Sequence, residues 1–174
     1  MGNETVNVEK IDVGPADVTF GTKYLGRTTG STTFTYTASY FDVETEEDGV
    51  VDQVLSGEEI TLEINLAYTD PESLSVIPWA NLVTSAGGES KLVIGGAIGT
   101  KMSDYADELV IHPRMMGDTD LSKDVKIHNC YPAPQTITLE YAREGTRQAQ
   151  ILFRALKDSA GEYFTIGDPS ITAV

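Results

Sequence analysis

Positive charge is absent from a long part of this chain. No lysine or arginine occurs between Arg27 and Lys91, although the chain has 12 of these residues. The same stretch holds twelve of its 27 acids: Asp42, Glu44, Glu46, Glu47, Asp48, Asp52, Glu58, Glu59, Glu63, Asp70, Glu72 and Glu89. Most of the net charge of −15 therefore belongs to one region. This excess argues against tight binding to nucleic acid and against docking on anionic lipid, since both depend on lysine and arginine.

Cysteine and long apolar runs are also scarce. Cys130 is the only cysteine, so no intramolecular disulfide can form and nothing supports a disulfide-stapled secreted fold. Residues 1–10 lack the apolar core of a signal peptide, and the longest apolar runs are far shorter than a membrane span. We therefore expect a protein without a membrane anchor that is made in the cytoplasm.

What remains is an ordinary globular composition. The 174 residues are 40% apolar and 22% charged, and a chain of this length buries roughly 70% of its unfolded surface. Residues 1–16 are polar and end near Gly14 and Pro15, which predicts a flexible N-terminal arm. Residues 17–174 are expected to form a single domain.

Two alternating runs flank the most acidic segment. In the first, Phe34, Tyr36, Ala38 and Tyr40 alternate with Thr33, Thr35, Thr37 and Ser39. In the second, Ile60, Leu62, Ile64 and Leu66 alternate with Thr61, Glu63, Asn65 and Ala67. This period of two predicts two long strands, each with one apolar and one polar face. Residues 42–59 between them are too many for a tight turn, so we expect an extended acidic loop.

Other local sequence features also predict a mainly β fold. Asp70 and Pro71 indicate a helix start, and Pro78 keeps that helix short. Strand-like segments bounded by Gly, Pro or Asp follow at 91–94, 108–112, 124–131, 136–143, 147–156 and 163–166, with turns expected at 144–145 and 158–161. The expected fold is a β-sandwich or partly closed barrel of about eight strands with one short flanking α-helix.

The residues that carry chemistry form no recognisable pattern. His112, His128 and Cys130 are the only nitrogen and sulfur ligand candidates, and although His128 and Cys130 would share a strand face, three ligands without paired spacing favour ordinary strand residues over a zinc site. The glycine run at 95–101 has neither phosphate-loop nor dinucleotide spacing. The acidic loop does not follow a calcium-loop pattern and reads as a solvated loop. We expect no catalytic residues, cofactor or metal.

The order of the pieces resembles the major tail tube proteins of long-tailed bacteriophages, from about Val18 to Asp168. The segments that carry the resemblance run from Gly21 to Gly26, Thr33 to Thr37, Tyr40 to Glu44, Val54 to Glu63, Asp70 to Leu74, Val125 to His128, Tyr131 to Ala133, Phe153 to Asp158 and Tyr163 to Asp168. Each segment alone is unspecific, and it is their shared order that is similar to the family.

The resemblance implies a structural virion protein. Its protomers would form hexameric rings that stack head-to-tail by helical assembly into a hollow tail tube, through which the genome is ejected. Implied partners are other copies of the chain, together with tape-measure, sheath or tail-terminator and baseplate proteins, while DNA passes without specific binding. The particle would be assembled in the cytoplasm of a bacterial host. The loop after the first long strand would reach a neighbouring ring, through Phe41, Asp42, Glu44, Glu46, Glu47, Asp48 and Asp52.

The polar strand faces suit the wall of such a tube. A lysine-lined wall would gain affinity for DNA at every ring, whereas hydroxyl, amide and carboxylate groups would not. We expect an acidic lumen lined by Thr33, Thr35, Thr37, Ser39, Thr61, Glu63 and Asn65.

Two alternatives stay open. The same fold and assembly would serve as the inner tube of a phage-tail-like contractile injection system, such as a bacteriocin or a type VI-like machine. A monomeric β-sandwich binding module is the other, and exposed aromatic side chains on loops would be its mark. Rings or tubes would exclude the binding module, and a persistent monomer would favour it.

Overall fold

The computed structural model describes residues 15–96, 98–133, 138–140, 148–168 and 170–171. The predicted N-terminal arm (1–16) lies outside these residues except for its last two positions, and so does the turn expected at 144–145. The elements are β1 (Ala16–Phe20), β2 (Lys23–Arg27), β3 (Thr33–Thr45), β4 (Gly49–Leu66), α1 (Pro71–Leu74), β5 (Ala80–Thr84), β6 (Ser90–Ile94), the 3-10 helix η2 (Met102–Tyr105), β7 (Asp107–Pro113), β8 (Val125–Pro132), β9 (Thr138–Glu140), β10 (Gln148–Ala155) and β11 (Phe164–Ile166).

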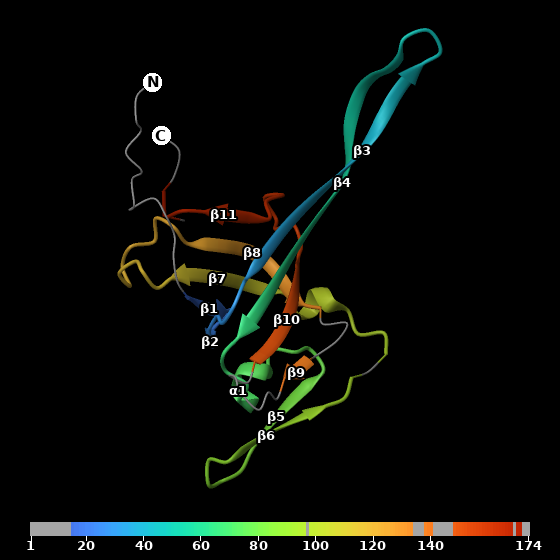
Figure 1. Ribbon diagram of the computed structural model, residues 1–174. Coiled ribbons are helices and arrows are strands. Elements are labelled where there is room, and N and C mark those ends of the chain that lie inside the picture. Colours follow the sequence, from blue (N-terminus) through green and yellow to red (C-terminus); the bar gives the residue numbers. More distant parts are fainter. Residues whose placement is uncertain (1–14, 97, 134–137, 141–147, 169, 172–174) are drawn as a thin grey trace.

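A bent antiparallel sheet forms the body of the molecule (Figure 1). Its strands run in the order β2-β1-β7-β8-β10-β4-β3, while β11 adds to β8 and β9 adds to β10. Strand β8 joins two layers, because Ile127 pairs with β7 and β11 whereas its last residues pair with β10. Among the described residues, an isolated bridge joins Thr28, just after β2, to Leu66 of β4 without closing the sheet into a barrel.

The core lies between these layers, where the apolar faces of the strands meet. The alternating residues Ile60, Leu62, Ile64 and Leu66 of β4 are all buried, as the sequence pattern predicted. Burying four such side chains stabilises the fold by roughly 1.5–3 kcal/mol each. The ring of Phe153 on β10 packs against Phe20 of β1 with centroids 5.5 Å apart, which ties the layers together.

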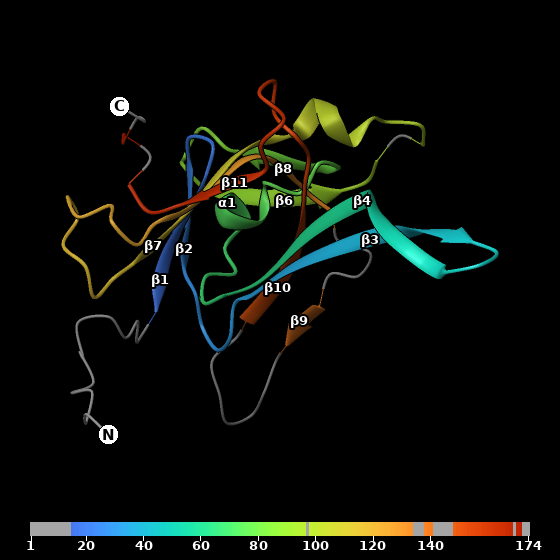
Figure 2. The same cartoon turned by 90° about the horizontal axis from the view of Figure 1, so that it is seen from above.

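The β3–β4 hairpin extends far beyond the body (Figures 1 and 2). We call its outer part, residues 40–55, the arm. The loop predicted over residues 42–59 is not a loop: β3 continues to Thr45, β4 begins at Gly49, and only residues 46–48 form the turn. Gly49 closes the turn with φ of 71°, a conformation that suits glycine. The segment therefore projects as a paired ribbon.

Helix α1 is a single turn, as the sequence predicted. The Asp70 side chain caps it by accepting hydrogen bonds from the Ser73 backbone N–H at 3.0 Å and the Ser73 hydroxyl at 2.8 Å. Partial burial of Asp70 opposes its ionisation, but these hydrogen bonds outweigh that cost and lower the pKa of the carboxyl. Pro71 occupies the first turn, where its missing N–H costs nothing.

The expected fold class is confirmed: the protein is mainly β, built as a sandwich with one short α-helix in the described residues. Strand β5 was not predicted from the sequence; it pairs only with β6, in a separate two-stranded sheet. In Figure 1 this β5–β6 hairpin points to the end of the molecule opposite the arm. Among the described residues, no helix has the length and apolar character needed to cross a membrane.

Candidate assembly surfaces

Large apolar side chains cover the arm, and they are exposed because no other described residue of the chain packs over them. Tyr40 is 60% exposed and Phe41 66% exposed on β3, while Val54 is 51% exposed on β4. Further exposed apolar residues of the arm are Val43, Val50, Val51 and Leu55. A soluble monomer rarely gathers so many on one projection, and such gatherings mark interaction surfaces.

Both faces of the arm carry this apolar surface. Opposed residues of a hairpin share a face, and successive pairs alternate between faces. Tyr40 opposes Leu55 on one face, and Phe41 opposes Val54 on the other. An extra residue in β4, at the bulge beside Ser39 and Tyr40, sets this register and re-aims the β4 side chains. The arm is therefore apolar on two sides.

The predicted ring-to-ring residues all lie on the arm, in two settings. Glu46, Glu47 and Asp48 form the turn at its tip. Phe41, Asp42, Glu44 and Asp52 lie on the paired strands instead of in a loop. Asp42 accepts a hydrogen bond from the Gln53 side chain at 2.8 Å, and the Thr45 hydroxyl accepts one from the Asp48 backbone N–H at 3.1 Å. Carboxylate side chains therefore lie between the exposed apolar side chains along the arm.

The seven predicted lumen-facing residues lie on β3 and β4 as expected, and the register gathers them on the face away from the core. Thr33 opposes Glu63, and Thr35 opposes Thr61. The remaining three are Thr37 opposite Glu59, Ser39 opposite Gly57, and Asn65 opposite Gln150 of β10. The Gln150 side chain also donates a hydrogen bond to the Glu63 carboxylate. The structure thus brings these groups onto one polar face.

A cation also reaches this face, which the sequence analysis did not anticipate. Arg154 of β10 opposes Thr61, and its guanidinium lies 3.5 Å from the Glu59 carboxylate. The period-two pattern of β10 could have placed Arg154 there, but only the strand order shows that β10 borders β4. The pairing partly offsets the positive charge of the arginine.

A cluster of polar and aromatic side chains holds the root of the arm. Glu58 accepts hydrogen bonds from Lys157 at 2.7 Å and from the Tyr36 hydroxyl at 2.9 Å. The ammonium of Lys157 also lies 5.2 Å from the centre of the Tyr163 ring. The hydrogen bond from Lys157, followed by that from Tyr36, lowers the pKa of the Glu58 carboxyl, and the same carboxyl raises the pKa of Lys157. These contacts fix where the arm leaves the body.

The β5–β6 hairpin offers a second surface at the opposite end. Val83 is exposed on β5, and Val93 and Ile94 are exposed on β6. Lys91, the first cation after the stretch without positive charge, lies on β6 opposite Val83. This end is therefore apolar and carries one cation, Lys91, beside one acid, Glu89, whereas the arm is apolar and acidic.

The three ligand candidates from the sequence do not converge. Cys130 is fully buried in the core, and burial raises the pKa of its thiol to about 12. The expectation that His128 and Cys130 share a strand face is wrong, because β8 has an extra residue opposite β7: Leu109 pairs with Ile127, but Asp107 pairs with Cys130. His112 lies elsewhere, with its Nδ1 2.6 Å from the buried Asp124 carboxylate.

Taken together, the fold and these surfaces define a mainly β sandwich with a long, exposed, apolar and acidic hairpin. No protein-family model matches the chain, and no curated protein sequence matches it. Among solved structures, it is similar to the anti-feeding prophage cap, described as the cap that terminates the AFP tube and determined by cryo-electron microscopy. The TM-score is 0.55 at 11% sequence identity, over 92% of this chain and 97% of that chain. This similarity shows a shared fold.

Proposed function

We propose that this chain is a structural component of a phage tail or a phage-tail-like particle. In this proposal it forms hexameric rings that stack into a hollow tube for genome ejection. The observation that carries the proposal is the arm, whose two faces expose apolar side chains beyond the body. The fold shared with a tube-terminating cap supports a tail component independently of the arm.

The partner that suits the arm best is another copy of the same chain. A two-stranded ribbon is marginally stable by itself in water, so covering both faces and the free edges would stabilise it. The opposite end of the molecule exposes Val83, Val93 and Ile94, which match the apolar groups of the arm, and Lys91 there could pair with one of its acids. Contact between unlike ends is heterologous, and such contacts build open stacks.

The polar face of β3, β4 and β10 is proposed as the lumen wall. Its threonines and carboxylates would gain no counterion-release affinity for DNA. Arg154 is the cation that could oppose this role, and its contact with Glu59 at 3.5 Å reduces that conflict. Tape-measure, sheath or terminator and baseplate proteins would be the further partners of such a tube.

A tube-terminating cap is a second candidate, because the similar structure is described as one. A tube protomer needs a stacking surface on both ends of its ring, whereas a cap needs only one. Open-ended tubes from the purified chain would favour the protomer, and single rings that never elongate would favour the cap. Either role could belong to a phage or to a contractile injection system.

A paired substitution on the arm tests this proposal. Phe41→Ser with Val54→Ser removes one opposed apolar pair and leaves the buried core untouched. The matched control is Ile171→Ser, which removes an apolar side chain that is 77% exposed outside the arm. Light scattering should show loss of assembly for the arm variant only, with unchanged circular dichroism. Equal assembly of both variants would refute the role of the arm.

A further inference from the structure

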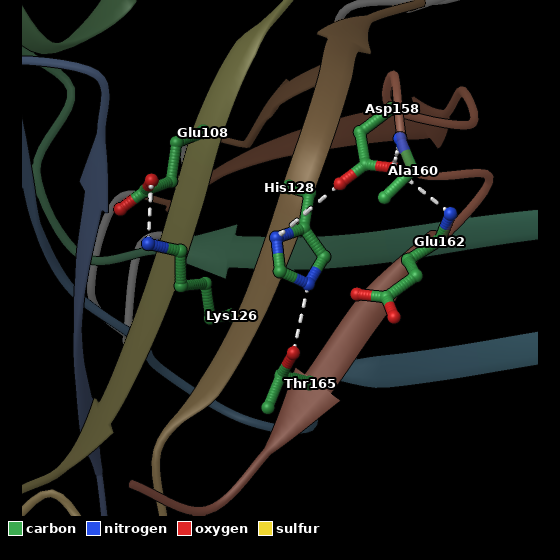
Figure 3. A network of polar contacts seen from close by, with 7 residues as sticks. All are labelled: Glu108, Lys126, His128, Asp158, Ala160, Glu162 and Thr165. Carbon is green, nitrogen blue, oxygen red and sulfur yellow. Dashed lines mark hydrogen bonds and ion pairs between the residues drawn. The ribbon is translucent and has the colours of Figure 1, made fainter. Parts of the chain in front are cut away.

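Three potential metal ligands meet on the far side of β8 from the core, apart from the surfaces proposed for assembly. His128 lies on β8, Asp158 follows β10, and Glu162 precedes β11 (Figure 3). One ligand atom from each lies within 4.8 Å of the others. A backbone hydrogen bond from His128 to the Tyr163 carbonyl, at 3.0 Å, holds the turn against β8.

Each of the first two ligands is oriented by a hydrogen bond at its other atom. Asp158 uses Oδ1 to accept from the backbone N–H groups of Ala160 at 2.8 Å and Glu162 at 2.9 Å. This leaves Oδ2 facing Nδ1 of His128. The other ring nitrogen, Nε2, lies 2.7 Å from the Thr165 hydroxyl. The Thr165 hydroxyl can donate to Nε2 or accept from it; in the tautomer in which Nε2 donates, Nδ1 carries the lone pair, the arrangement typical of metal-binding histidines.

In that tautomer a lone pair on Nδ1 lies next to the Asp158 carboxylate. The distance from Nδ1 to Oδ2 is 3.9 Å, which is too long for a direct hydrogen bond. The two lysines nearest in sequence are engaged with other groups: Lys126 lies 2.7 Å from Glu108, and Lys157 lies 2.7 Å from Glu58. With Nδ1 unprotonated, a metal cation between the ring and the carboxylates would accept lone pairs from both.

We propose that His128 Nδ1, Asp158 Oδ2 and the Glu162 carboxylate bind a divalent transition-metal ion, with zinc bound more tightly than manganese. One imidazole and two carboxylates suit such an ion, and the affinity order places zinc above manganese. A separation of 3.9 Å allows bonds of roughly 2.0–2.2 Å from one ion to both oriented ligands. Glu162 is exposed, so its side chain has room to rotate onto the ion.

By binding Asp158 and Glu162 together with His128, the ion would fasten the turn between β10 and β11 to strand β8. Strand β11 has three residues, and its Phe164 packs on Phe34 near the root of the arm with ring centroids 4.8 Å apart. An ion that binds the folded chain and not the unfolded chain raises the free energy of unfolding, and the increase grows with the logarithm of the free ion concentration divided by Kd. The metal site is thus a structural device, and it holds whether or not the chain forms tubes.

The test is calorimetric titration of the metal-free full chain with zinc chloride, paired with thermal unfolding. The expected result is one ion per chain, a higher Tm with zinc, and reversal by EDTA. Glu162→Gln keeps the backbone N–H to Asp158 and should weaken zinc binding by at least about tenfold, as changes even beyond the direct ligands do in other sites. His128→Gln should weaken it similarly.

The control is His112→Gln, which removes the other histidine, paired with Asp124 away from the cluster. This variant should bind zinc as the unmodified chain does. An identical titration for Glu162→Gln and the unmodified chain would overturn the proposal, and so would an absence of binding heat in the unmodified chain. Loss of binding in His112→Gln with retention in His128→Gln would place the ion at the wrong histidine and overturn it equally.

Discussion

Gly26 shows how a single residue sets the join between β2 and the segment after β4. Its φ is 102°, and a Cβ at this position would lie 2.3 Å from the Tyr68 ring. Both the backbone conformation and the close approach require glycine. Gly26 belongs to the first segment of the tail-tube resemblance, and packing alone accounts for the glycine at this position.

Gly26→Ala is expected to destabilise the fold by about 2 kcal/mol or more, from the strained backbone alone. For a chain of this size the Tm should fall by roughly 4–8 °C. Gly87→Ala is the matched control, because its Cβ would meet only the Ser85 hydroxyl at an ordinary 3.7 Å. A Tm loss for Gly26→Ala no greater than for Gly87→Ala would contradict this reading.

Glu58 gives the root of the arm a dependence on pH. Its folded pKa is lowered by the hydrogen bonds from Lys157 and Tyr36, so its contribution is present above the unfolded pKa of about 4.3 and is lost as pH falls through the folded value. The pKa of Lys157 is raised, so that contribution is present below about pH 10.4 and is lost as pH rises through the raised value. The contact between Glu58 and Lys157 should therefore stabilise the fold between about pH 4.3 and about pH 10.4.

The corresponding measurement compares the unmodified chain with Glu58→Gln across pH. The difference in their free energies of unfolding should be constant from about pH 5 to pH 9 and should shrink below about pH 4, where the carboxylate becomes protonated. A difference that stays the same into acid would show that the charge on Glu58 contributes nothing at the root.

At the scale of elements, the arm depends on strand pairing and not on a loop. Replacing residues 42–53 by Asn-Gly would join Phe41 to Val54, which already oppose each other, through a two-residue turn of the preferred type. The shortened chain should keep its fold, since the removed residues contribute no core side chain. It should lose assembly, as measured by light scattering. Normal assembly of this variant would show that the arm tip is dispensable.

The sequence predicted the inner halves of β3 and β4 because their apolar and polar residues alternate, and it predicted α1 because Asp70 and Pro71 are specific helix-start residues. It did not predict the outer halves. Acidic residues disfavour strands, and two bulges interrupt the alternation, so the local signal was that of a loop. The pairing there follows from the hairpin partner, which local composition does not describe.

The candidate surfaces were predictable to different degrees. The residues predicted for ring-to-ring contact lie on the arm and those predicted for the lumen lie on the polar face, while their roles remain predictions. The strand at residues 91–94, which is β6, was predicted, but β5 was not, because its only strand partner is β6 and its own residues do not alternate clearly. The meeting of His128 with Asp158 and Glu162 was also not predicted, since it depends on β11 pairing with β8.

At the scale of the whole molecule, charge and shape together favour an ordered association. The net charge of −15 opposes the approach of two copies, and salt screens this repulsion over about 10 Å at 0.1 M. The apolar faces of the arm do not depend on such screening. Assembly should therefore increase with moderate salt, as followed by light scattering at fixed protein concentration. A steady decrease with salt would show that charge pairing drives assembly.

The central claim is that the chain builds rings or tubes from copies of itself. Negative-stain electron microscopy of the purified full chain, at several protein concentrations and with added salt, tests it most directly. The account predicts six-fold rings or hollow tubes, with the arm reaching from one ring to the next. A uniform field of single small particles under every condition would contradict it and favour a monomeric binding module.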